Sequence, residues 1–211
     1  MKKTIVITLA IMVLGAAALL GACGEADVVL KYSRESLDKL VGAFPDVTAE
    51  TDNGYAFSVD DETVLRISGD YSTGKDDIVL STPLKPFTDA GMDVSKLGEG
   101  LSADDNTLYV TTDFGDEADK AGTAADALFA AAAAKRDALT YHAALDHYGI
   151  ALTAGKFEFA KDYNTNDKDI VFILKSDAIA ATGADVGNIE GWAFVTMDDG
   201  AEVLAKPYDL G

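Results

Sequence analysis

The chain has 211 residues, of which 48% are hydrophobic and 9% aromatic, so its composition supports a folded core and excludes an intrinsically disordered protein. Its formal net charge of −19 repels nucleic-acid phosphates, which argues against nucleic acid as a partner. Cys23 is the single cysteine, so no intramolecular disulfide can form and stability has to come from the core.

The first 22 residues have the plan of a secretory signal peptide. Lysines at the start precede an apolar run, which ends in small residues before Cys23. The run is also long enough to span a membrane as an uncleaved helix, which is the alternative interpretation. The tetrapeptide Leu20-Gly21-Ala22-Cys23 resembles the lipobox of bacterial lipoproteins.

The lipobox resemblance implies that the Cys23 thiol receives a diacylglyceryl group and that the chain is cut before this residue. Acyl chains of this kind anchor a protein stably, because each buried methylene contributes about 0.8 kcal/mol. We therefore expect a signal peptide over 1–22, a lipidated tether over 23–32, and an extracytoplasmic protein. The membrane partner, reached through the lipid on Cys23, is the cell membrane or the outer membrane.

One stretch of the remaining chain occurs twice. Residues 70–79 read DYSTGKDDIV and residues 162–171 read DYNTNDKDIV, an offset of 92 positions (162 − 70). The same offset relates Gly91 to Gly183 and Asp93 to Asp185. Two copies at this spacing predict a tandem pair of related folding units rather than a solenoid, which usually needs three or more repeats.

The first unit is expected over residues 33–115. Ser33 can cap a helix that Pro45 ends, and a short helix has Pro86 in its first turn and Gly91 just past its end. Alternating apolar residues between turn signals predict four strands. These strands span 55–59, 64–68, 77–82 and 108–112.

The second unit is expected over residues 116–211. An apolar and alanine-rich stripe predicts a long helix over 123–148, and Ser176 can cap a short helix that Gly183 ends. The predicted strands span 157–160, 170–174, 192–196 and 203–205. The predicted fold class is α+β: a tandem duplication of an α-β-β-β-α-β unit, with mostly antiparallel sheets and helices packed on one face.

An acidic loop in the second unit offers oxygen ligands at alternating positions. Its candidate ligands are Asp162, Asn164, Asn166 and Asp169. The pattern suits Ca²⁺, but it departs from an EF-hand because Asp167 replaces the glycine and Ile173 the final glutamate. The alternative is a polar hairpin turn in which aspartate bonds its own backbone. No other cofactor is predicted.

The two histidines, His142 and His147, fall within the predicted long helix. On a helix, side chains five positions apart point in different directions, because each residue advances about 100°. The two histidines could therefore not bind one metal ion from a helix. His142 and Asp146 are four apart and could form an acid–base pair, or an ordinary contact on the helix surface.

Aromatic residues provide the remaining candidates for recognition. Tyr71 and Tyr163 occupy matched positions beside turns, where each could contact a ligand or form a structural hydrogen bond, and Trp192 is the single tryptophan. No nucleophile motif or glycine-rich phosphate loop occurs. We therefore expect a lipid-anchored, non-enzymatic module that binds an envelope protein or a small ligand in a groove between its repeats. The alternative is an envelope hydrolase or metal-dependent enzyme that uses the acidic loops or His142.

Overall fold

The computed structural model describes seven parts of the chain. They are residues 46–49, 55–67, 78–113, 139–142, 147–160, 169–197 and 200–209. Within these parts, no helix has both the length and the apolar character needed to cross a membrane.

The first sheet is antiparallel and has six strands in the order β1-β2-β3-β4-β6-β5. The strands are β1 (Asp46–Ala49), β2 (Tyr55–Ser58), β3 (Val64–Ile67), β4 (Ile78–Pro83), β5 (Leu101–Ala103) and β6 (Thr107–Thr112). Alternation forms its buried face, since Phe57, Leu65, Leu80 and Val110 are buried and lie opposite one another from β2 to β6. The four predicted strands of this unit are confirmed.

The second sheet has the same order with every strand number raised by six: β7-β8-β9-β10-β12-β11. Its strands are β7 (Leu139–His142), β8 (His147–Leu152), β9 (Gly155–Ala160), β10 (Ile170–Lys175), β11 (Ala193–Thr196) and β12 (Glu202–Tyr208). Its four predicted strands are also confirmed. The 92-residue offset therefore marks a repeated sheet topology.

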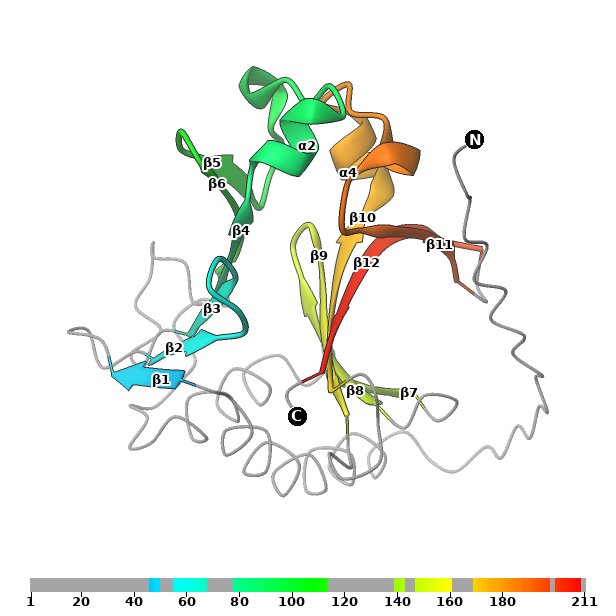
Figure 1. The fold of residues 1–211 in the computed structure, drawn as a ribbon. Helices are drawn as coiled ribbons and strands as arrows, with labels where there is room; N and C mark the ends of the chain where they lie inside the picture. The colour runs from blue at the N-terminus through cyan, green and yellow to red at the C-terminus, as the bar shows by residue number, and fades with distance from the viewer. Residues whose placement is uncertain are drawn as a thin grey trace, which may run out of the picture.

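The same helical connection follows β4 and β10. In the first repeat, α2 (Lys85–Asp89) leads to the 3₁₀ helix η1 (Val94–Lys96). In the second, α4 (Ser176–Ala180) leads to the 3₁₀ helix η3 (Val186–Asn188). Figure 1 shows α2 and α4 next to each other at one end of the molecule, with a sheet extending away from each.

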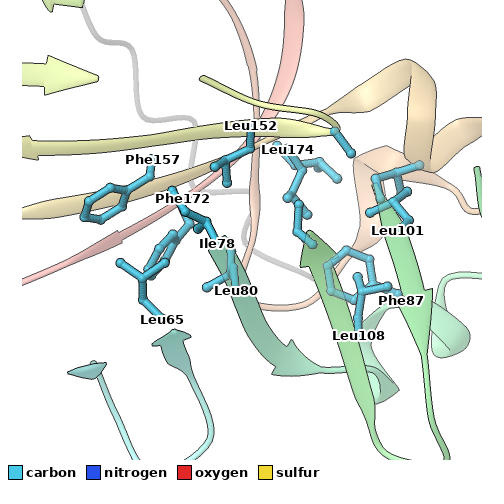
Figure 2. Close-up of a cluster of buried hydrophobic side chains, with 14 of the residues drawn as sticks. Leu65, Ile78, Leu80, Phe87, Leu101, Leu108, Leu152, Phe157, Phe172 and Leu174 are labelled. Carbon is cyan, nitrogen blue, oxygen red and sulfur yellow. The ribbon is translucent and has the colours of Figure 1, made fainter. Parts of the chain in front are cut away.

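The two sheets share one core. Buried side chains of the first repeat, including Leu65 and Leu80, belong to the same cluster as Phe157 and Phe172 of the second. Figure 2 shows these side chains converging from both sheets. The rings of Phe157 and Phe172 stack with centroids 5.5 Å apart. Each fully buried side chain of this size contributes about 1.5–3 kcal/mol, so this common core is a large part of the stability.

A pseudo-two-fold seam joins the repeats where the short helices end. The Asp93 N–H donates to the Thr182 carbonyl (3.0 Å), and the Asp185 N–H donates to the Ala90 carbonyl (2.7 Å). Each bond is the other shifted by 92 residues (93 + 92 = 185 and 90 + 92 = 182). The repeats thus meet through the same backbone segment in both, as in an isologous dimer interface.

The duplicated glycines lie at this contact between the repeats. Gly91 and Gly183 both have a φ of 95°, which L side chains rarely adopt. A Cβ on Gly91 would lie 3.4 Å from the Gly183 carbonyl oxygen, and a Cβ on Gly183 would lie 3.6 Å from the Gly91 carbonyl oxygen. The sequence explanation of these glycines as helix stops is therefore incomplete, because they also line the contact between repeats.

The duplicated aspartates cap the 3₁₀ helices beside the seam. The Asp93 carboxylate accepts from the Ser95 N–H, and the Asp185 carboxylate accepts from the Gly187 N–H, each at 3.1 Å. The Ser95 hydrogen bonds and the nearby Lys96 lower the pKa of Asp93. Both aspartates therefore fix the backbone that makes the seam.

A second pair of contacts links the end of each final strand to a hairpin of the other repeat. The Thr153 N–H, in the β8–β9 turn, donates to the Thr112 hydroxyl at the end of β6 (2.8 Å). The Tyr208 hydroxyl, at the end of β12, donates to the Thr63 hydroxyl beside β3 (3.1 Å). These contacts hold the far ends of the sheets together.

The predicted α+β class, with helices packed on one face of each sheet, is wrong. The described structure is mostly β, and its α-helices, α2 and α4, have five residues each. The predicted helix over 123–148 fails over its last part, because residues 139–142 and 147–152 form β7 and β8. Tertiary pairing explains this: within the predicted helix, His147 lies opposite Ala160 of β9 and Tyr148 lies opposite Phe159. Residues 33–44 and 123–138 lie outside the described part.

Replacing Gly91 by alanine should destabilise the protein by about 1–3 kcal/mol, because alanine is strained at the φ of 95° that this position adopts. Gly98→Ala is the matched control, since a Cβ there meets nothing within 4 Å. Urea unfolding followed by circular dichroism measures both variants. Equal stability of Gly91→Ala and Gly98→Ala would contradict the positive φ assigned to Gly91 beside the seam.

Candidate functional site

Most of the site residues predicted from sequence lie outside the described residues. These are Cys23, Tyr71, Tyr163, Asp162, Asn164 and Asn166. The lipid attachment, the tyrosine contacts and the calcium loop therefore stay predictions, as does an enzyme built on that loop. Within the described residues, no group of three or more His, Cys, Asp or Glu side chains is placed to hold a metal ion.

Two predicted residues can be placed with their side chains. Asp169 is buried immediately before β10, and its N–H donates to the Tyr208 carbonyl (2.8 Å). Trp192 precedes β11 and packs edge-on against Phe87 of α2, with ring centroids 5.6 Å apart. Trp192 thus joins the two repeats, and its ring remains partly exposed.

The histidines lie on a hairpin instead of a helix. His142 of β7 is directly opposite His147 of β8. The helical separation that argued against a shared site therefore does not apply. The predicted i, i+4 pairing of His142 with Asp146 does not apply either, because His142 is in a strand.

A buried charged cluster lies on β8 and β9, and sequence reasoning missed it. The Glu158 carboxylate is 1% exposed, with the Lys156 ammonium 2.6 Å away and His147 Nδ1 at 3.9 Å. Lys156 and Glu158 alternate with Phe157 and Phe159, so they occupy the opposite face of β9. That alternation was visible in the sequence, but the partner from β8 was not, because the predicted helix over 123–148 included His147.

Among the elements whose exposure the structure describes, the edge strand β11 is the most exposed apolar one. Among the described residues, the exposed large hydrophobic side chains are Val94, Phe194 and Val195, and the last two belong to β11. All four residues of this strand are exposed, and its neighbour in the sheet is β12. An uncharged, apolar edge of this kind is normally avoided in monomeric proteins because it can pair with another chain.

The hairpin to β12 determines which backbone groups of β11 point outward. The Met197 N–H donates to the Ala201 carbonyl (2.8 Å), and Gly200, with φ 85°, donates to the Met197 carbonyl (2.9 Å). Hydrogen-bonded pairs alternate along an antiparallel ladder, so Val195 pairs with β12, and the N–H and C=O of Phe194 and Thr196 point to the free edge.

The corresponding edge of the first repeat is built differently. Strand β5 has three residues, and its apolar Leu101 is buried. Asp104, at its end, accepts a hydrogen bond from the Tyr109 hydroxyl (2.6 Å) and bonds from the Asn106 and Thr107 N–H groups. These bonds, the Tyr109 bond first, lower the pKa of Asp104 to about 2, so a negative charge persists at this edge. A short strand ending in a charge is a protected edge.

The chain segment that contains β11 is acidic. Residues 176–205 contain no Lys, Arg or His. Their acids are Asp177, Asp185, Glu190, Asp198, Asp199 and Glu202. Glu190 and Glu202 are exposed, and Glu202 lies opposite Thr196 of β11. The edge therefore combines outward backbone groups, apolar side chains and negative charge.

No protein-family model matches the chain, and neither a curated protein nor a solved structure shows significant similarity to it.

Replacing Lys156 by methionine should cost about 3–5 kcal/mol, because it removes a cation from a carboxylate that is 1% exposed. Adding Glu158→Gln should recover part of that loss, since the buried charge is then gone. Lys85→Met is the control: Lys85 pairs with Asp89 on the surface, and such pairs contribute about 1 kcal/mol or less. Urea unfolding measures all three, and equal losses for Lys156→Met and Lys85→Met would contradict the buried pair.

Proposed function

We propose that the protein is a lipid-anchored, non-enzymatic interaction module of the bacterial cell envelope, and that its partner is another envelope protein. The observation that carries the binding role is β11, an apolar edge strand whose four residues are all exposed. The lipobox resemblance at Cys23 supports attachment to the membrane through lipid.

The interior between the sheets is not the binding surface of this proposal. Side chains from both repeats meet there in one core, including Leu80 and Phe172, which are each 1% exposed (Figure 2). A groove between the repeats, the expectation from sequence, would need that space to be open. The exposed edge of the second sheet is the alternative that the described residues support.

The membrane attachment is tested by labelling cells with an alkyne analogue of palmitate. The wild-type protein should take up the label, and Cys23→Ser should not, because serine lacks the thiol that accepts the lipid. Gly24→Ala is the matched control, since it leaves the four lipobox residues intact. Labelling of Cys23→Ser at the wild-type level would contradict the proposed anchor.

The binding role is tested in the same cells by chemical crosslinking in intact envelopes, followed by purification and mass spectrometry. Wild-type protein should recover a defined envelope protein in near-stoichiometric amount. Recovery of the protein without any crosslinked partner would contradict the interaction role.

A further inference from the structure

We propose that β11 is the docking edge for an extended, basic segment of the partner protein, which joins the second sheet as an additional strand beside β11. This inference rests on the proposed function and specifies its surface and the chemistry of its partner. Strand addition of this kind draws affinity from main-chain hydrogen bonds and specificity from alternating side chains.

The backbone of β11 has hydrogen-bonding groups that β12 does not use. The outward N–H and C=O groups of Phe194 and Thr196 can bond an added strand without disturbing the ladder to β12. The ladder also holds β11 extended before any partner arrives, because all four of its residues pair with β12. Preorganisation of this kind lowers the entropy lost on binding.

The side chains of β11 are apolar on both faces of the sheet. Phe194 is 41% exposed and Val195 38% exposed, and successive residues of a strand point to opposite faces. An added strand would therefore meet an apolar side chain of β11 on each face of the sheet. An incoming segment with alternating apolar residues can cover either Phe194 or Val195 with its apolar face. Each cross-strand pair of side chains contributes about 0.2–1 kcal/mol.

Charge selects the partner. Exposed Glu190 and Glu202 flank β11, and the nearest bases along the chain are Lys175 and Lys206. A second copy of this chain would bring a further net charge of −19 to an already acidic edge. Like charges brought together at an interface are unfavourable, whereas lysine or arginine on an incoming strand complements the site.

The test uses the full-length protein in detergent and a fluorescent octapeptide of alternating lysine and valine. Thr196→Pro removes an outward N–H but no bond to β12, and prolines are tolerated at such edge positions. We expect this variant to bind the peptide about tenfold more weakly than wild type or worse, because one strand bond is lost and the proline ring obstructs pairing.

Ala103→Pro is the matched control, because Ala103 is at the corresponding outward position of β5. The Asp104 N–H bonds the Thr107 carbonyl and the Thr111 N–H bonds the Gly100 carbonyl, so alternation points the Ala103 N–H away from β6. Ala103→Pro should bind the peptide as wild type does. Melting temperatures show whether either proline disturbs the fold.

A second variant keeps the backbone of β11 intact. Glu190→Lys combined with Glu202→Lys reverses exposed charges, so the fold should be retained while binding of the lysine–valine peptide weakens. An alternating glutamate–valine octapeptide should bind wild type more weakly than the lysine–valine peptide. Amide exchange at Phe194 and Thr196 should slow when the lysine–valine peptide is added.

Three results would overturn the proposal. They are equal peptide binding by wild type and Thr196→Pro, equal binding of the two octapeptides, or a dimer in analytical ultracentrifugation that Thr196→Pro abolishes. The first two would leave the proposed function standing if a partner is still crosslinked in envelopes. Failure to crosslink any partner would overturn the proposed function even where the peptide binds β11.

Discussion

The reciprocal backbone hydrogen bonds at the seam determine how the rest of the molecule is arranged. Asp93 bonds the carbonyl of Thr182, and Asp185 bonds that of Ala90, so each repeat binds the other through the same segment. Gly91 and Gly183 lie at this contact with a φ of 95°, a backbone conformation that favours glycine. Because the seam fixes α2 against α4, the sheets beyond them face each other and bury one common core (Figure 1). The folding unit is therefore the pair of repeats.

Part of this arrangement could be predicted from the sequence. The shared offset of the glycines and aspartates indicated a duplication, and alternating residues indicated eight of the strands, among them β4 and β10. The seam itself could not be predicted, because a glycine that ends a helix and one that admits a neighbouring backbone have the same sequence signal. Strand β8 was missed for a different reason: the predicted helix covered its first two residues, no element was predicted for the rest, and the strand depends on its pairing with β9.

In the candidate site, too, some features could be predicted from the sequence and others could not. Trp192 was singled out from sequence, and the structure places its ring against Phe87, where it supports the contact between repeats. The charged cluster of Lys156 and Glu158 could not be predicted, because it forms only once sheet pairing has placed these residues on the face of β9 opposite Phe157. Strand β11 was predicted, but its position at the edge was not, because strand order is a property of the topology. The two repeats differ in structure at this point: β5 is short and ends in a charge, whereas β11 exposes Phe194 and Val195.

The central claim is that the repeats form a single cooperative unit around one core. Differential scanning calorimetry of the full-length protein in detergent tests it most directly, through the ratio of the van't Hoff enthalpy to the calorimetric enthalpy. A shared core and seam predict one transition and a ratio of about 1. Two resolved transitions, or a ratio of about 0.5 with each half unfolding separately, would contradict the claim.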